Sequence, residues 1–194
     1  MNEQVDVKTI LRRLANMTVG KRGGQLAPHR PLLPLYALAR CLRGEPRLIR
    51  FAAIDQPLRR LLVEFGPPRR SVHPEYPFWR LQNDGIWEVE SQGPLEPRMA
   101  SADPKKSELI KHRAAGGFPD HIHALFSEDP DLVARVVDLL VSRHFPVSLR
   151  EEILAAVGLP LDTPREAPAP RSADFRDEVL DRKSTRLNSS HGKL

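Results

Sequence analysis

The stretch FWRLQNDGIWEVE, residues 78–90, sets the expected architecture because it joins aromatic residues to a turn signal. Each half alternates apolar and polar residues, which is typical of a short strand with one buried face. The Asn-Asp-Gly sequence at 83–85 favours a tight turn between the halves. The stretch therefore predicts a β-hairpin with three residues in its core: Trp79, Leu81 and Trp87.

Helical periodicity predominates outside this hairpin. A buried helix is expected after Pro28 and Pro31, and a third helix is expected from Asp55. Further helical patterns cover residues 5–20, 105–115, 119–127, 129–145 and 148–159. Gly116 and Gly117 are expected to stop one helix, and loops are expected at residues 66–77 and 91–104. The sequence thus predicts a mainly α (α+β) fold, a helical domain of residues 1–160 with a small β-hairpin.

The character of the chain changes after Pro160. Residues 161–173 form a Pro/Ala-rich linker, and helical spacing resumes at residues 174–180. Residues 181–194 include DRKSTRLNSSH, which resembles the translation of a sequencing-library adapter. We therefore expect an interrupted reading frame, with a natural C-terminal domain missing.

Composition and charge narrow the class of protein. No apolar run reaches the roughly 18 residues that span a bilayer, and a single cysteine suits a reducing compartment, so we expect a cytoplasmic protein. Residues 1–113 hold 20 Lys and Arg against 12 Asp and Glu, whereas residues 114–160 hold 3 against 7. Arginine binds phosphate well, so nucleic acid is the first partner to consider. A basic excess that serves only solubility is the alternative.

Several basic residues occupy positions suited to phosphate. Lys21 and Arg22 lie in a glycine-containing loop, and His29 and Arg30 lie at a helix start, where free N–H groups favour anions. The simpler interpretation of such residues is helix capping and surface charge. Three further arginines belong to this region: Arg69 and Arg70 precede the proline-containing loop, and Arg80 lies between Trp79 and Leu81.

Tyr76 and Pro77 form an unusual pair beside these arginines. Because a residue before proline is held extended, the Tyr76 ring has few orientations. Together the two residues could form a rigid apolar wall at the edge of a basic surface. The simpler interpretation, which physics alone favours, is a loop packed against the hairpin.

Histidines suggest a metal site only weakly. His121 and His123 are two residues apart, so they do not share a helix face, and His112 is the nearest third ligand. No catalytic or metal-binding motif is present in residues 1–160.

These segments together resemble a known family. GKRGGQLAPHRPLLPLYALARCLRGEPRLIRF, PLRRLLVEFGPPRRSVHPEYPFWRLQNDGIWEV and ELIKHRAAGGFPDHI are similar to the sulfur-binding domain of phosphorothioate-dependent, type IV restriction endonucleases. The resemblance covers about residues 5–160. The segment ADFRDEVL also resembles the helix that precedes the HNH nuclease module in these bacterial defence enzymes.

The resemblance implies binding of double-stranded DNA in which sulfur replaces a non-bridging phosphate oxygen. It implies a sulfur pocket formed by Tyr76, Pro77, His29, Arg30 and Arg80. Generic contacts to the DNA backbone would come from Lys21, Arg22, Arg69, Arg70 and, on charge and position only, Arg98. The chain itself would be non-catalytic and hold no cofactor, since a divalent metal and structural zinc belong to the missing HNH module.

Two alternatives remain open. One is a generic DNA-binding module of another defence nuclease or regulator, which does not read sulfur. The other is a metal-dependent enzyme that uses His112, His121 and His123.

Overall fold

The structure, a computed structural model, describes residues 6–17, 21–22, 25–26, 29–66, 70–98 and 101–159. Contacts divide the chain into one unit of Met1–Leu161 and another of Asp162–Leu194. The expected linker, the start of a nuclease domain and the adapter-like tail all lie outside the described residues.

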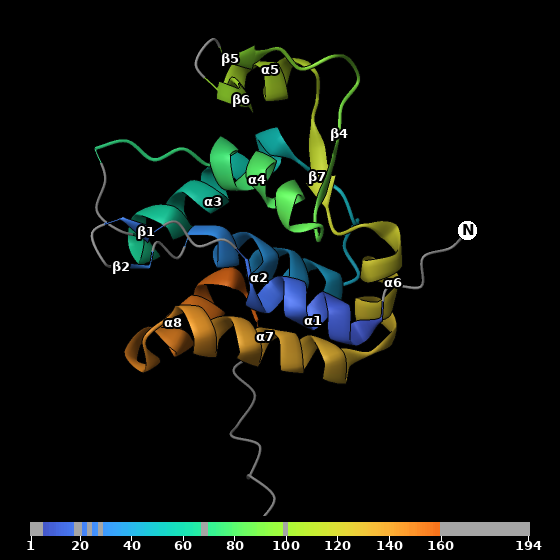
Figure 1. Cartoon of the computed structure of the whole chain (residues 1–194), viewed down its shortest axis with the longest axis vertical. Helices are drawn as coiled ribbons and strands as arrows, with labels where there is room; N and C mark the ends of the chain where they lie inside the picture. Colours follow the sequence, from blue (N-terminus) through green and yellow to red (C-terminus); the bar gives the residue numbers. More distant parts are fainter. Residues whose placement is uncertain are drawn as a thin grey trace, which may run out of the picture. The chain divides into compact units, whose positions relative to one another are not determined.

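Helices predominate in the described part of the chain, as predicted (Figure 1). They are α1 (Val7–Ala15), α2 (His29–Leu42), α3 (Phe51–Phe65), α4 (Glu75–Arg80), the 3-10 helix η1 (Leu81–Asp84), α5 (Lys106–Lys111), α6 (Asp120–Glu128), α7 (Pro130–His144) and α8 (Val147–Val157). The three last helices match their predicted ranges closely. None of the described helices is long and apolar enough to cross a membrane.

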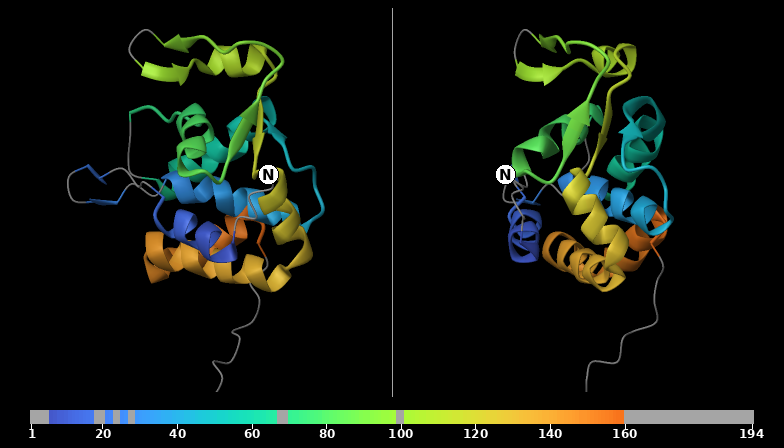
Figure 2. Two further views of the ribbon diagram at one scale, coloured as in Figure 1. Left: turned by 45° about the vertical axis from the view of Figure 1, so that its right-hand side comes forward. Right: turned by 90° about the vertical axis from the view of Figure 1, so that its right-hand side faces the viewer.

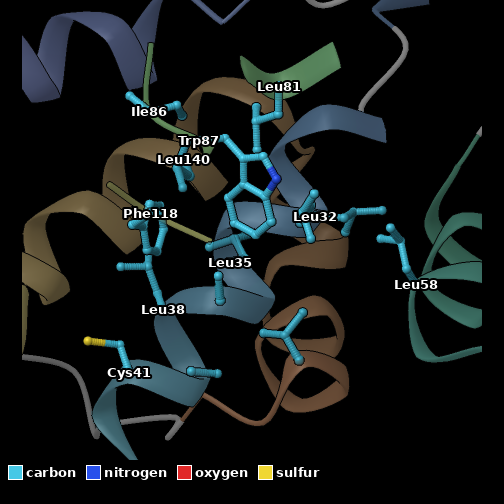
Figure 3. Packing of buried hydrophobic residues seen from close by; sticks show 14 of the residues in the cluster. Leu32, Leu35, Leu38, Cys41, Leu58, Leu81, Ile86, Trp87, Phe118 and Leu140 are labelled. Carbon is cyan, nitrogen blue, oxygen red and sulfur yellow. The ribbon is translucent and has the colours of Figure 1, made fainter. Parts of the chain in front are cut away.

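Helix α2 lies at the centre of the packing. It contacts α3, α4, α6, α7 and α8, and Figure 2 shows it lying between the α1, α7 and α8 helices and the α3 and α4 helices. Its leucines Leu32, Leu33, Leu35 and Leu38 have no exposed surface. Figure 3 shows the leucines of α2 in one cluster with Trp87 and Phe118. The predicted burial of this helix is therefore confirmed.

The strands are short and form three antiparallel pieces of sheet. They are β1 (Lys21–Arg22), β2 (Gln25–Leu26), β3 (Ile49–Arg50), β4 (Glu88–Glu90), β5 (Pro97–Arg98), β6 (Ser101–Pro104) and β7 (Ala115–Gly117). β1 pairs with β2 and β5 with β6, while the largest piece has the order β3-β7-β4. Residues 91–104, predicted to be a loop, therefore contain a hairpin, β5–β6.

The predicted hairpin within residues 78–90 is wrong. Phe78 does not begin a strand: it lies in α4, which continues directly into η1, and only residues 88–90 are extended. Phe78 and Leu81 are fully buried while Trp79 and Arg80 between them are partly exposed. This spacing of three follows a helix face, and the four-residue run FWRL is too short to separate it from strand alternation.

The partner of β4 is β7, which contains the two glycines that were expected to stop a helix. Val89 lies opposite Gly116, and Glu88 lies opposite Gly117. A Cβ on Gly116 would lie 2.7 Å from Trp87 Nε1, and one on Gly117 would overlap the Arg47 carbonyl oxygen. The glycines thus permit a close backbone approach at the centre of the sheet.

Helix α3 begins four residues before the predicted start at Asp55. Its buried face already includes Phe51 and Ile54, and the Phe51 N–H donates to the Ala114 carbonyl at 2.8 Å. Pro57 consequently lies inside the helix, not in its first turn. Burial of the preceding apolar turn outweighs the hydrogen bond that proline cannot make.

Candidate nucleic-acid interface

Tyr76 is the centre of the candidate site, and it lies in the first turn of α4. The prediction that proline holds Tyr76 extended is wrong, because Glu75, Tyr76 and Pro77 are all helical. Proline is tolerated here because the first N–H groups of a helix have no intrahelical partner. The Pro77 ring is buried, whereas Tyr76 is partly exposed. Of the expected apolar wall, only the tyrosine reaches the surface substantially.

Three side chains contact the Tyr76 ring. The His73 ring stacks on it with a centroid separation of 4.9 Å and an interplanar angle of 28°. The guanidinium carbons of Arg80 and Arg98 lie 4.7 Å and 4.9 Å from its centroid. Arg98 Nη1 also donates a 2.7 Å hydrogen bond to the tyrosine hydroxyl. These contacts hold the ring in one orientation with positive charge against it.

Glu75 contacts two of these side chains, Arg98 and His73. Its carboxylate accepts a hydrogen bond from Arg98 Nη2 at 2.8 Å and lies 3.0 Å from His73 Nδ1. Burial favours the neutral acid, but the helix N–H and the Arg98 and His73 contacts prevail and lower the pKa of Glu75. The residue therefore stays ionised within the cluster near neutral pH.

Arg80 is held by the β5–β6 hairpin. Its Nε donates to Asp103 Oδ2 at 2.9 Å, and its Nη2 donates to the same oxygen. This hydrogen bond is the main reason that the pKa of Arg80 is raised, against a smaller opposing effect of burial. Since Arg98 comes from β5 and Asp103 from β6, the hairpin supplies one cation and one anion to the site.

Arg30 joins the start of α2 to the end of η1. Its Nη1 donates to Asp84 Oδ2 at 2.9 Å, and Asp84 lies in η1, which follows α4 without a break. Arg13 Nη1 donates to the carbonyl of Gly85 at 2.9 Å, so α1 holds the same turn. The segment predicted as a hairpin turn is instead the place where helices α1 and α2 are anchored to α4.

The predicted site residues are therefore brought together in part. Arg30, Tyr76, Pro77 and Arg80 belong to α2, α4 and the contacts just described, and Arg98, expected only as a generic contact, lies against Tyr76. Arg70 is exposed in the segment before α4. His29 begins α2 and Lys21 and Arg22 form β1, but the side chains of these three and all of Arg69 lie outside what the structure describes.

Sequence reasoning missed four polar members of the cluster: His73, Glu75, Asp84 and Asp103. His73 and Glu75 had a signal, because both lie within three residues of Tyr76. Asp84 was interpreted only as a turn residue. No sequence signal pointed to Asp103, because it is 23 residues from Arg80 and lies in a stretch that was expected to be a loop.

The histidine alternative gains no support from the geometry. His112 Nε2 lies 3.4 Å from Glu108, and the Ser127 hydroxyl donates to the carbonyl of His123. Among the residues the structure describes, no three or more His, Cys, Asp or Glu residues gather as a metal site would need.

Solved structures of known proteins share the fold of this chain. Solved structures with the same fold include the sulfur binding domain of ScoMcrA complexed with phosphorothioated DNA, at 24% identity and a TM-score of 0.66 over 77% of this chain and 94% of that one. The sulfur binding and SRA domains of ScoMcrA complexed with phosphorothioated DNA give 26% identity and a TM-score of 0.69 over 78% and 47%. The type IV phosphorothioation-dependent restriction endonuclease ScoMcrA gives 25% identity and a TM-score of 0.66 over 76% and 32%.

The chain thus spans about a third of that endonuclease. No curated protein matches the chain. Residues 7–162, most of the sequence, match the model of a single family. The chain therefore belongs to the family described as ScoMcrA-like, DNA sulfur-binding domain.

Proposed function

We propose that this domain binds double-stranded DNA and recognises a phosphorothioate linkage with the surface around Tyr76. The observation that carries the proposal is the partly exposed Tyr76 ring, held against Arg80 and Arg98 in a domain of this family. The ScoMcrA fragment that is 26% identical is complexed with phosphorothioated DNA, which supports the same ligand class here.

The chemistry of the site suits sulfur. Sulfur is larger and more polarisable than oxygen and accepts hydrogen bonds poorly. An aromatic wall therefore favours sulfur, because an ordinary phosphate oxygen would lose hydration there without a replacement donor. Tyr76 would supply most of this wall, with Pro77 supporting it from the interior.

The surrounding residues divide into two proposed groups. His29, Arg30 and Arg80 would lie at the pocket, and we add Arg98 because it contacts Tyr76 directly. The backbone of DNA beyond the modified linkage would be contacted by the remaining basic residues: Lys21, Arg22, Arg69 and Arg70. Such contacts set affinity and salt dependence but do not select sulfur.

A titration by fluorescence anisotropy tests the proposal. Residues 1–160 are mixed at fixed salt with two duplexes of one sequence, one of which carries the phosphorothioate. We expect tighter binding of the modified duplex by at least about tenfold, or 1.4 kcal/mol. Equal affinities would instead favour the generic DNA-binding module.

In the longer protein, the domain would direct a modification-dependent endonuclease to its DNA. The similarity to the ScoMcrA endonuclease supports this role. An HNH module after residue 180, its divalent metal and structural zinc, and a bacterial, cytoplasmic setting stay predictions. Reading the coding DNA past codon 180 for a Cys-x-x-Cys and an HNH motif is the direct test.

A further inference from the structure

Two hydrogen bonds in series connect an exposed hydroxyl to the buried carboxylate beside Tyr76. Ser71 Oγ lies 2.8 Å from His73 Nε2, and His73 Nδ1 lies 3.0 Å from Glu75 Oε1. Exposure falls along this Ser71–His73–Glu75 relay: Ser71 is exposed, while the side chains of His73 and Glu75 are 38% and 5% exposed. The His73 ring also stacks on Tyr76. The relay therefore connects the proposed sulfur pocket to a hydroxyl that is next to Arg70 in sequence.

The chemistry of the three groups decides where each hydrogen lies. Glu75 is ionised because its pKa is lowered, so its carboxylate only accepts and His73 Nδ1 must carry a hydrogen. In the neutral imidazole the other nitrogen, Nε2, is then an acceptor, and the Ser71 hydroxyl must donate to it. The relay thus turns the Ser71 hydrogen inward and leaves only lone pairs of Oγ for a ligand from solvent.

Protonation of His73 reverses the outer hydrogen bond. Because an imidazolium donates from both nitrogens, Nε2 then donates to Ser71 Oγ, and the hydroxyl hydrogen is released for an outside acceptor. In the neutral state Ser71 offers lone pairs, which repel a phosphate oxygen. In the protonated state it offers a donor with a positive charge behind it. One proton therefore converts Ser71 from an acceptor into a phosphate-binding donor.

The charged groups that face His73 come from α4 and β5. Helix α4 contributes Glu75 and the Tyr76 ring, and β5 contributes Arg98, whose Nη2 donates to the same Glu75 oxygen at 2.8 Å. The carboxylate attracts an imidazolium and the guanidinium repels it. A DNA phosphate beside Ser71 would add a negative charge on the solvent side, and this charge also attracts the imidazolium. Contact with the DNA backbone should therefore be accompanied by proton uptake.

We propose that Ser71 and His73 form a proton-controlled phosphate site, in which His73 takes up a proton as Ser71 donates to a non-bridging oxygen of the DNA backbone. This inference rests on the proposed function, to which it adds a backbone contact next to Arg70. A hydroxyl donor suits oxygen, and both duplexes offer such oxygens, so the contact serves both alike. It makes the affinity for DNA depend on pH, but not the preference for sulfur.

Anisotropy titrations of the full chain at about pH 6 and about pH 8, at one salt concentration, test the inference. Phosphate linkages keep their charge over this range, whereas a histidine changes its own. We expect the affinity for both duplexes to be at least about fivefold higher at the lower pH. One proton taken up on binding permits at most about a tenfold change per pH unit.

His73→Asn removes the titrating group, while its amide can still donate to Glu75. The ratio of the affinities at the two pH values should fall about fivefold. A merely structural role would weaken binding by the same factor at both pH values and leave this ratio unchanged. His29, which we also place at the pocket, is kept in every variant, so the difference between the variants reports His73.

Ser71→Ala removes the hydroxyl and keeps the imidazole. At about pH 8 the affinity should stay within about twofold of that of the unaltered chain, because the neutral relay turns the hydroxyl hydrogen inward. At about pH 6 the affinity should fall about fivefold, because a hydrogen bond to a charged phosphate is lost. The pH dependence should therefore shrink here too.

His123→Asn is the matched control. His123 also lies beside a serine, with Ser127 Oγ 3.5 Å from its Nδ1, but it belongs to α6. Ser127 in turn contacts Cys41, which is about 18 Å along α2 from the helix start at His29. The control removes the same kind of titrating group away from Tyr76, and it should leave the pH dependence of binding unchanged.

A smaller pH dependence in His73→Asn and Ser71→Ala, but not in His123→Asn, supports the inference, with thermal unfolding at both pH values verifying that each variant is folded. If His73→Asn keeps the full pH dependence, or if Ser71→Ala weakens binding equally at both pH values, the inference is wrong. The preference for the phosphorothioate duplex at one pH tests the proposed function separately. Equal binding of both duplexes would overturn that function, while the pH dependence would still decide the role of Ser71 and His73.

Discussion

Tyr76 illustrates how much a single side chain of this domain is constrained. Its ring contacts His73, Arg80 and Arg98, and its hydroxyl accepts a hydrogen bond from Arg98. The ring and the hydroxyl therefore have separable roles: the ring would contact sulfur, while the hydroxyl holds an arginine.

Tyr76→Ala should remove most of the preference for modified DNA. The variant loses the apolar wall, so affinity for the phosphorothioate duplex should fall by about tenfold or more, with a smaller fall for the unmodified duplex. Tyr76→Phe, which keeps the ring, should retain most of the preference. Anisotropy titrations of both duplexes measure the two ratios.

Arg70→Ala provides the contrasting case, because Arg70 is exposed. The substitution should lower the affinity for both duplexes by a similar factor. It should also reduce the slope of log affinity against log salt concentration by about one. If Tyr76→Ala and Arg70→Ala changed the affinities for the two duplexes in the same way, the division between pocket contacts and backbone contacts would be wrong.

At the scale of elements, the site depends on a helix where a strand was expected. Helix α4 and η1 present Tyr76, Arg80 and Asp84 on consecutive turns, and each reaches an element distant in sequence. Strand alternation would have sent neighbouring residues to opposite faces. Phe78 of α4 packs edge to face against Trp87, the residue before β4, with ring centroids 6.1 Å apart.

Gly117→Ala tests how closely β7 must approach its neighbours. The new methyl group would overlap the Arg47 carbonyl oxygen, so the backbone must move. We expect a loss of about 2–4 kcal/mol in the free energy of unfolding, measured by urea denaturation.

Gly93→Ala is the matched control for this substitution. There the nearest atom, at 2.5 Å, belongs to the His112 side chain, which can rotate away. We expect a loss below about 1 kcal/mol. If the two variants lost equal amounts of the free energy of unfolding, the close backbone approach at the centre of the sheet would not explain the need for glycine at position 117.

At the scale of the whole domain, stability should depend on pH through His144. This residue is only 8% exposed at the end of α7, and the backbone of Leu14 in α1 is near enough to affect its pKa. Burial, together with the nearby positive charge of Arg143, lowers the pKa of His144 from its ordinary value of 6.5, against the opposing effect of the Leu14 backbone. The folded domain therefore holds this imidazole neutral at pH values where the unfolded chain protonates it.

The sign of the effect follows from proton binding. As the pH falls through 6.5, the unfolded state takes up the proton first, so the free energy of unfolding should decrease until the pH passes the folded pKa. Glu75 acts in a lower window: its pKa is lowered from 4.5, so the stability it contributes is lost only as the pH falls below that value.

His144→Asn should reduce this pH dependence, because the amide can still donate a hydrogen bond but does not titrate. Urea denaturation at about pH 7.5 and about pH 5.5 should show a smaller loss of stability on acidification for the variant than for the unaltered domain. An identical loss in both proteins would assign the pH dependence to other groups.

Much of the helical architecture could be predicted from local sequence, whereas the candidate site residues came from the family resemblance. Helical spacing over ten or more residues located α2, α7 and α8, because each needs only its own periodic apolar face to be recognised. The family resemblance singled out Arg30, Tyr76 and Arg80, and the structure places these three residues around α4 and η1. Their proposed roles in binding DNA await the titrations.

Only the tertiary structure decided which residues meet. The four-residue run FWRL could follow either a strand or a helix, and burial of Phe78 and Leu81 against the core selected the helix. The glycines of β7 read locally as a helix stop, yet their partners are the strands at residues 49–50 and 88–90. Likewise, Asp103 meets Arg80 only when the β5–β6 hairpin packs on α4. Local sequence carries periodicity and chemistry, whereas pairings between distant segments arise only when the shared core closes.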